Sequence, residues 1–297
     1  MAMARIVLGN RDGALALRQA REALEQLTDE WPDVNFALRT IKNAAAKSSD
    51  GDDPLVRSLV NGDIGVAVAQ LETLPLALPE EVTLAAVSRR LEPRTALVTK
   101  GTRALADLPR GARVGVLTPR DAAYLAGQHL GVEAVEVSGT IESDLKLLTS
   151  GELDGLLVPA ATLIALDHRN RLDNVLDPEA FAPAPGQGAL GLLVRADDDL
   201  AFEVAYSLQH RPSFDRVRAE RSFARSLRQG PPESDEACRE CVVGALANVT
   251  DDGELTLFGA VLRGETTLQA SVSGEAKEAD ELGRELAQDV RRQLAGL

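Results

Sequence analysis

Two cysteines near the end of the chain are the residues whose chemistry depends most directly on spacing. Cys238 and Cys241 are separated by two residues, a spacing found in redox pairs and in half of a zinc site. A structural zinc site needs four ligands. The histidines of the chain, His129, His168 and His210, show no spacing that would complete one. The pattern therefore predicts no metal site, and ordinary thiols are the simplest interpretation.

A glycine-rich segment, Gly186-Gln187-Gly188, has the composition of a phosphate-binding loop. A phosphate loop of the Walker type requires Lys followed by Ser or Thr after its last glycine. Ala189 and Leu190 stand there instead. The segment is therefore predicted to be a hinge between two lobes.

One arginine is placed where it could bind an anion. Arg11 follows a short apolar stretch at residues 5–9 that predicts a buried strand, and it precedes a helical pattern over residues 13–27. Asp12 is the predicted N-cap of that helix. A cation at this turn can hold an anion together with the N–H groups of the helix N-terminus. The alternative is a surface arginine.

Strands alternate with helices through the first two thirds of the chain. This alternation predicts parallel sheets covered by helices on both faces. Residues 43–54 are predicted to form a flexible acidic loop, and residues 200–228 one amphipathic helix that is either continuous or broken near Pro212. Antiparallel strands and a terminal helix are expected over residues 242–294. The change of pattern predicts a domain boundary near residues 200–215.

Composition restricts the classes of partner. The chain of 297 residues is 44% hydrophobic, which provides for a large core and predicts two or three domains. Its net charge of -14 argues against nucleic acid or a membrane as a partner, so any anion site must be a local basic pocket. Two cysteines are too few for a disulfide framework, and the N-terminus enters a strand instead of a signal peptide. We expect a cytoplasmic protein with a small-molecule substrate.

The order of these elements and several motifs resemble porphobilinogen deaminase, also called hydroxymethylbilane synthase, along almost the whole chain. The most informative matches are Pro-Ala-Pro-Gly-Gln-Gly-Ala-Leu-Gly at residues 183–191 and Ala-Glu-Arg at residues 219–221. Weaker matches to the family's motifs occur at residues 9–19, 92–96, 108–121 and 150–154. Each match is weak alone, but all of them in order over one chain are specific to the family.

The resemblance implies an α/β fold of three domains. Two lobes like those of periplasmic binding proteins would enclose a cleft, and a smaller C-terminal α+β domain would follow. We expect residues 1–90 and 185–203 in the first lobe, 91–184 in the second and 204–297 in the third domain. The family is expected to be monomeric. It also implies a dipyrromethane cofactor attached to a cysteine of the third domain, for which Cys238 and Cys241 are the candidates here.

The catalytic carboxylate of the family is replaced in this sequence. The family joins four porphobilinogen molecules head to tail, and the Asp of a Ser-Met-Lys-Asp-Val-Pro segment stabilises a developing cationic pyrrole and moves protons. In the matching residues 70–75, Thr73 replaces that aspartate and Glu72 replaces the lysine before it. Glu72 and Thr73 are therefore the catalytic candidates. Adjacent side chains on a strand or tight turn are expected to point to opposite sides, which argues against Glu72 as the substitute.

The basic residues that would bind the substrate's acetate and propionate groups are partly exchanged as well. Two arginines of the family are retained, and three others are replaced by aspartate or serine at positions 121, 138 and 144. Gln187 belongs to the hinge motif. The predicted substrate-binding residues are Arg11, Arg120, Asp121, Ser138, Asp144 and Gln187.

A cleft with fewer cations should hold a polycarboxylate poorly, since each lost charge-assisted hydrogen bond costs about 1.5–3 kcal/mol. The sequence therefore predicts a divergent transferase or lyase of the family, which acts in the inter-lobe cleft on a small substrate with fewer carboxylates than porphobilinogen, in specialised biosynthesis. Two alternatives stay open. One is a genuine hydroxymethylbilane synthase, and the other is a non-catalytic two-lobe ligand-binding protein.

Overall fold

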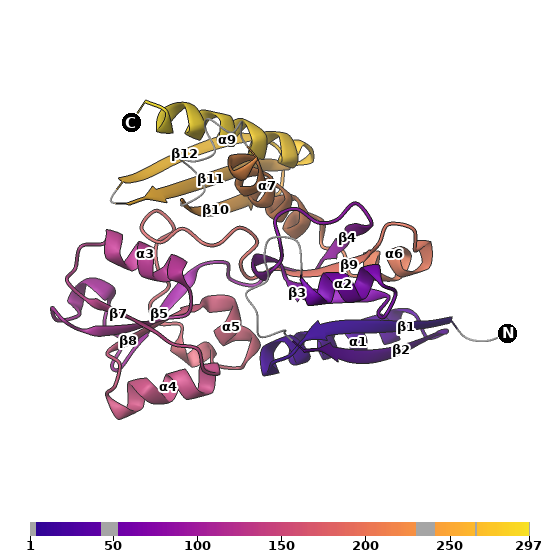
Figure 1. Cartoon of the computed structure of the whole chain (residues 1–297), viewed down its shortest axis with the longest axis horizontal. Helices are drawn as coiled ribbons and strands as arrows, with labels where there is room; N and C mark the ends of the chain where they lie inside the picture. Colours follow the sequence, from indigo (N-terminus) through magenta and orange to yellow (C-terminus); the bar gives the residue numbers. More distant parts are fainter. Residues whose placement is uncertain (1–3, 43–52, 230–240, 265, 297) are drawn as a thin grey trace.

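The computed structural model describes residues 4–42, 53–229, 241–264 and 266–296. They form three sheets that occupy three regions of the molecule, with the C-terminal sheet lying across the two others (Figure 1). The predicted fold class is confirmed, because two α/β lobes precede a smaller α+β domain. The residue at which each domain begins or ends stays a prediction.

The first lobe is built on a five-stranded sheet in the order β2-β1-β3-β9-β4. Its strands are β1 (Ala4–Arg11), β2 (Val34–Ile41), β3 (Val66–Gln70), β4 (Val82–Val87) and β9 (Leu190–Arg195), and its helices are α1 (Ala14–Glu30), α2 (Pro54–Val60) and α6 (Asp199–Tyr206). β1 is parallel to β2 and β3, whereas β9 is antiparallel to β3 and β4. The expectation of a purely parallel sheet is wrong here, since β9 returns from the second lobe and enters the sheet from the opposite end.

Helix caps in the first lobe differ from those predicted. Gly13 is the N-cap residue of α1 and provides no side-chain hydrogen bond, so the assignment of this role to Asp12 is wrong. Asp53 caps α2 instead, and its carboxylate accepts hydrogen bonds from the N–H groups of Leu55 and Val56. Proline follows Asp53 at the first helical position, where its missing N–H has no cost. Of the predicted loop at 43–54, Pro54 is helical and Asp53 is the N-cap residue, and residues 43–52 lie outside the described residues.

The second lobe has a four-stranded sheet in the order β5-β8-β6-β7. Its elements are β5 (Thr95–Thr99), β6 (Arg113–Val116), α3 (Pro119–Gly127), β7 (Glu133–Glu136), α4 (Ile141–Ser150), β8 (Gly155–Pro159) and α5 (Ala160–Ala165). β6 is parallel to β7 and β8, and β5 is antiparallel to β8. α3 follows β6 directly in the chain. Its N-terminus therefore lies near the carboxyl end of that strand.

The C-terminal domain is an antiparallel sheet packed against two helices. The strands β10 (Val242–Val249), β11 (Glu254–Arg263) and β12 (Thr266–Glu275) follow one another in space, as predicted for this region. Helices α7 (Arg211–Arg228) and α9 (Ala279–Leu294) share a hydrophobic core with the sheet, in which Phe223 and Leu286 are almost fully buried.

The helical segment at 200–228 is broken, which confirms one of the two alternatives predicted from the sequence. α6 ends at Tyr206 and α7 begins at Arg211. The side chain of His210 caps α7 by accepting a hydrogen bond from the N–H of Ser213. Pro212 lies in the first turn, where a proline is tolerated. In the described residues, no helix is long and apolar enough to cross a membrane.

Candidate functional site

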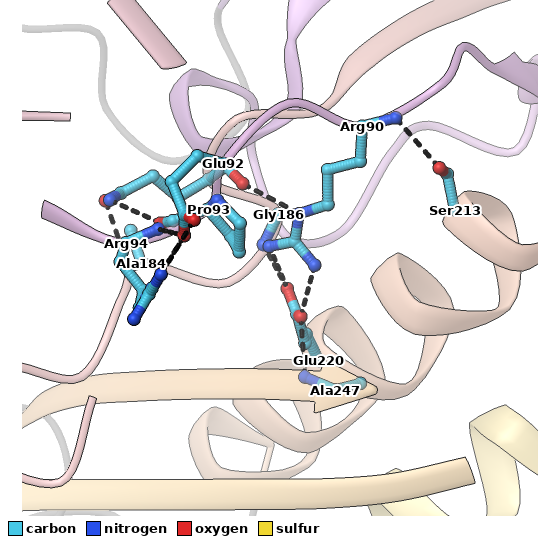
Figure 2. Close-up of polar contacts among 10 residues, drawn as sticks. Arg90, Glu92, Pro93, Arg94, Ala184, Gly186, Ser213, Glu220 and Ala247 are labelled. Carbon is cyan, nitrogen blue, oxygen red and sulfur yellow. Dashed lines mark hydrogen bonds and ion pairs between the residues drawn. The ribbon is translucent and has the colours of Figure 1, made fainter. Parts of the chain in front are cut away.

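Glu220 of α7 joins the three parts of the molecule. Its fully buried carboxylate accepts two hydrogen bonds from the guanidinium of Arg90, at 2.6 and 3.0 Å. It also accepts the backbone N–H groups of Gly186 and Ala247, each at 2.8 Å. Figure 2 shows these bonds converging on one side chain. Arg90 lies on the connection into the second lobe, Gly186 on the connection back and Ala247 in β10, so this glutamate sits at the junction of all three.

Gln187 takes part in the same junction. Its side-chain amide donates to the carbonyl of Pro93 at 2.7 Å and to the hydroxyl of Thr95 at 3.3 Å. Its side-chain oxygen accepts from the N–H of Ala184 at 3.2 Å. Because both ends of the amide are used to hold the two crossing connections together, the geometry favours the hinge interpretation of Gly186-Gln187-Gly188 over substrate binding by Gln187.

Arg221, the next residue along α7, holds a turn of the first lobe. Its guanidinium donates to the carbonyl oxygens of Leu71, Pro75 and Leu76, and the residue is only 7% exposed. Burial lowers the pKa of Arg221 to about 10. In the described part of the chain its hydrogen-bond partners are carbonyl oxygens, with no carboxylate among them. A cation therefore fixes the turn at residues 71–76, which carries the two catalytic candidates.

Glu72 and Thr73 face the same cavity. Residues Leu71–Thr73 form a 3₁₀ turn, in which successive side chains are about 120° apart because there are three residues per turn. The expectation that adjacent side chains here point to opposite sides is wrong for this reason. The hydroxyl of Thr73 donates to the carbonyl of Gln70 at 2.8 Å, so it serves the turn. Glu72 is the ionisable group of the pair.

The carboxyl group of Glu72 can carry a proton near neutral pH. The residue is half-buried, and its Oε2 is out of contact with solvent and has no hydrogen-bond partner. Burial raises the pKa of Glu72 to about 7, although the nearby Arg90 guanidinium opposes this shift. A carboxyl group with this pKa is suited to give and take protons at physiological pH.

The central cavity, defined here as the space of about 410 Å³ beside this turn, is lined by residues from all three parts of the molecule. The first lobe contributes Asp53 and residues 71–76, the second lobe Arg120, the return connection residues 184–185, and the C-terminal domain Arg221, Ala224, Arg228 and residues 241–243. Its size falls in the range of small-molecule sites.

Arg11 lies at the edge of this cavity and is already paired. It ends β1, forms an ion pair with Asp53, and donates to the carbonyl of Thr73 at 3.5 Å. The choice between an anion-binding and a surface arginine stays open, although the side chain is engaged within the protein. Its partner is the N-cap carboxylate of α2, whereas we had expected an anion at the N-terminus of α1.

Arg120 lines the cavity from the N-terminal turn of α3. One of its nitrogens donates to the carbonyl of Ala182, and the guanidinium lies 4.7 Å from the ring centroid of Tyr124. Its Nε and Nη1 atoms are buried and have no hydrogen-bond partner. Burial lowers the pKa of Arg120. Arg120 thus brings a cation to the cavity wall, and its role in binding an anion stays a prediction.

The three exchanged positions of the second lobe do not line the central cavity. The carboxylate of Asp121 accepts from the N–H and hydroxyl of Thr118, at 3.1 and 2.7 Å, and completes the N-terminal cap of α3. Ser138 is exposed in the segment after β7. Asp144 is 2% exposed at the start of α4, where burial raises its pKa and Oδ2 has no partner. Asp121 therefore stabilises the N-terminus of α3.

Of the two cysteines, Cys241 is buried on the wall of the cavity, directly before β10. It is not part of a disulfide. Cys238 lies outside the described residues. In the described ranges, no group of three or more metal-ligating side chains comes together.

Sequence reasoning missed the roles of four charged residues that build this site. Asp53 was assigned to a loop, although an acidic residue directly before a proline is a signal for an N-cap. Glu220 and Arg221 were recognised only as part of the family's Ala-Glu-Arg motif, without a structural role. Arg228 was not considered, because only the packing of α7 brings it to the cavity.

The chain is similar to proteins of one family along its length. A family model described as porphobilinogen deaminase, dipyromethane cofactor binding domain, matches residues 6–203. The chain is 40% identical to a porphobilinogen deaminase of Thermus thermophilus, over 97% of this chain and 96% of the relative. It is 34% identical to one of Deinococcus radiodurans, over 97% and 96%, and 35% identical to one of Nostoc, over 98% and 92%.

Similarity to solved structures is weaker. The effector binding domain of BenM with benzoate has a TM-score of 0.46 and 16% identity, over 78% of this chain and 98% of that one. A TRAP periplasmic solute binding protein from Desulfovibrio salexigens has a TM-score of 0.45 and 13% identity, over 70% and 73%.

Proposed function

The chain belongs to the porphobilinogen deaminase family, and from that premise we propose that it is a transferase that works in the central cavity with Glu72 as its proton-carrying group. Its substrate is a small molecule of the pyrrole type with fewer carboxylates than porphobilinogen. The observation that carries the proposal is the raised pKa of Glu72, about 7, on the wall of a cavity enclosed by three domains.

Glu72 supplies the chemistry that the family's aspartate would supply. The family's reaction needs a carboxyl group that faces a cationic pyrrole and exchanges protons with it. Glu72 lies one residue before the position of that aspartate, and the 3₁₀ turn directs it to the same cavity as Thr73. General acid–base catalysis is most effective when the pKa is near the working pH. The raised pKa of Glu72 therefore supports its role in proton transfer.

The charges of the cavity support a substrate with few carboxylates. Asp121, Ser138 and Asp144 bring no cation to it. The first lobe adds two carboxyl groups, those of Asp53 and Glu72. A substrate with several carboxylates would therefore lack the guanidinium partners that the family's arginines supply at these three positions.

The dipyrromethane group of the family fits the residues that are present. The thiol of Cys241 lies on the wall, and Arg120 has unused buried donors for a carboxylate. These residues would hold the group, which when bound supplies two linked pyrrole rings anchored covalently in the cavity. We propose this attachment as a feature of the chain, with Cys241 as the attachment residue and the monomer as the working form.

A second candidate is hydroxymethylbilane synthase itself, condensing four porphobilinogen molecules. The position of Cys241 on the same cavity as Glu72 favours it, because both elements of the family's reaction would then be present.

Incubation with porphobilinogen separates the two candidates. Purified protein is mixed with porphobilinogen, and uroporphyrin is measured after acid oxidation. We expect no uroporphyrin above that formed by a Glu72→Gln variant. Uroporphyrin that forms with the wild type and decreases by about 100-fold or more in Glu72→Gln would establish the second candidate and retain the role of Glu72.

An intact-mass measurement tests the cofactor. We expect a mass above the sequence value by two linked pyrrole units, which is lost in Cys241→Ser and retained in Cys238→Ser. Loss in Cys238→Ser alone would move the attachment to that residue. A wild-type mass equal to the sequence value would contradict the attachment.

A further inference from the structure

The outgoing connection, defined here as residues 88–94 between β4 and β5, carries the chain from the first lobe to the second. Any change in the angle between the lobes must be absorbed by this connection and by the one that returns. Two backbone hydrogen bonds join the outgoing connection to the returning chain. Ser88 donates to the carbonyl of Leu190 at 3.0 Å, and Leu91 donates to the carbonyl of Gly188 at 3.1 Å.

A second set of hydrogen bonds attaches this part of the chain to the residues that begin α7. The N–H of Val87 donates to the side-chain oxygen of Gln209 at 2.8 Å, and its carbonyl accepts from the N–H of His210 at 2.9 Å. The N–H of Arg90 donates to the hydroxyl oxygen of Ser213 at 2.9 Å (Figure 2). Ser213 is almost fully buried. The start of α7 therefore holds both the end of β4 and the outgoing connection.

These contacts fix the protonation state of His210. The N–H of Ser213 donates to Nδ1 of His210 at 3.3 Å, so Nδ1 must present a lone pair. The hydroxyl of Ser213 lies 2.8 Å from the same nitrogen. Because its oxygen already accepts the N–H of Arg90, its hydrogen is free to point to Nδ1. The imidazole is therefore neutral, with its proton on Nε2, and ends a chain of hydrogen bonds that begins at the backbone of Arg90.

A proton on Nδ1 does not fit this arrangement. It would face the buried backbone N–H of Ser213, and two donors would then meet without an acceptor. The hydroxyl of Ser213 could turn to accept from Nδ1, but a backbone N–H cannot reverse its role. Protonation of His210 must therefore separate the imidazole from the first turn of α7.

The surroundings of His210 also oppose a positive charge. It is the N-cap residue of α7, where the helix dipole is positive. Burial lowers the pKa of His210, and the guanidinium groups of Arg89 and Arg216 lower it further. The carboxylate of Asp215, in the next turn of α7, is bound by Arg211. The charged groups that act on the imidazole are thus cations from both the outgoing connection and α7.

We propose that His210 is a proton-sensitive lock on the outgoing connection, which the neutral imidazole holds through Ser213 and which the uptake of a proton loosens. Because the folded pKa of His210 lies below its ordinary value of 6.5, the lock is closed above this pH and opens as the pH falls below it. The inference does not depend on the proposed function, since it concerns the connection between the lobes and not the central cavity.

The test compares backbone protection with the state of the imidazole in the full-length protein. Amide hydrogen exchange is followed from pH 8 to pH 5 and corrected for the intrinsic pH dependence of exchange. We expect the protection of the Arg90 and Ser213 amides to decrease by about 10-fold as the pH falls below 6.5. Nitrogen-15 NMR of histidine-labelled protein should show Nδ1 of His210 without a proton at pH 8.

Two variants separate the lock from a general loss of structure. In His210→Asn, the side-chain oxygen can still cap α7 but cannot take up a proton, so protection at Arg90 should stay high at both ends of the pH range. In Ser213→Ala, the link to Arg90 is absent, so protection at Arg90 should be low at every pH while the amides after Asp215 in α7 stay protected.

His129→Asn is the matched control. His129 is exposed in the second lobe and has a φ of 52°, a conformation that asparagine tolerates. This variant should show the same pH dependence at Arg90 as the wild type. Protection at Arg90 that does not change with pH in the wild type would overturn the inference. The same decrease in His210→Asn, or a proton on Nδ1 at pH 8, would overturn it as well.

Discussion

Glu72 holds a proton near neutral pH because its carboxyl group is withdrawn from water and no ion pair replaces the lost hydration. Its Oε2 is buried without a partner, and the guanidinium of Arg90, which acts on its pKa, is bound to Glu220. The folded state therefore keeps a proton on Glu72 at a pH where the unfolded chain has released it, since the folded pKa of about 7 lies above the ordinary value of 4.5. Stability from this group is then lost as the pH rises from about 4.5 to about 7.

The variant Glu72→Gln has no ionisable group at this position. It should therefore not show the loss of stability that the wild type shows as the pH rises from about 4.5 to about 7. We expect its free energy of unfolding to exceed that of the wild type by on the order of 2–3 kcal/mol at pH 8 and to be close to it at pH 4. Urea unfolding at both pH values measures the difference, with the exposed Glu80→Gln on the same lobe as a control. A Glu72→Gln variant whose stability relative to the wild type does not change with pH would contradict the raised pKa.

At the scale of elements, α7 positions the turn that presents Glu72. The guanidinium of Arg221 reaches three carbonyl oxygens of residues 71–76 from the helix. Lysine at this position would keep the charge but could not span the same set of acceptors, because its ammonium is a compact group without the planar fork. The turn would lose its attachment while the helix stayed intact.

We expect Arg221→Lys to lower the free energy of unfolding by about 2–4 kcal/mol. Amide hydrogen exchange should accelerate in residues 71–76 and stay unchanged in β2, which is remote from the turn. Arg225→Lys serves as the control on the same helix. If exchange in the turn were as slow as in the wild type, Arg221 would not be what holds it.

At the scale of the whole molecule, one buried carboxylate connects three domains. Glu220 binds Arg90, Gly186 and Ala247, which belong to the two connections between the lobes and to the C-terminal sheet (Figure 2). Removing one partner of a buried ion pair leaves the other charge without compensation. The junction is therefore expected to be the most sensitive polar site of the fold.

Glu220→Gln should cost about 3–5 kcal/mol, because the buried Arg90 keeps its charge. The double variant Arg90→Met, Glu220→Met should cost less than Glu220→Gln, since it removes both charges together. Calorimetric unfolding of the wild type, Glu220→Gln and the double variant measures the order of their stabilities. A loss below about 1 kcal/mol in Glu220→Gln would show that solvent or another group compensates Arg90.

The sequence alone determined the elements and the family. The strand and helix patterns, the Gly186-Gln187-Gly188 segment and the Ala-Glu-Arg motif depend on neighbours in the chain, and local hydrogen bonding and apolar periodicity are visible there. One purely local detail also failed. Asp12 was a plausible cap by type, yet α1 begins without a side-chain cap.

Tertiary structure decided which charges meet. Asp53, Glu72, Arg120 and Arg228 come from four separate elements, and only the packing of three domains brings them to one cavity. Asp121, whose alignment with a family arginine had predicted substrate binding, instead completes a local capping box with Thr118. The pKa of Glu72 likewise depends on burial beside the hinge, and burial is a property of the assembled fold that no local pattern encodes.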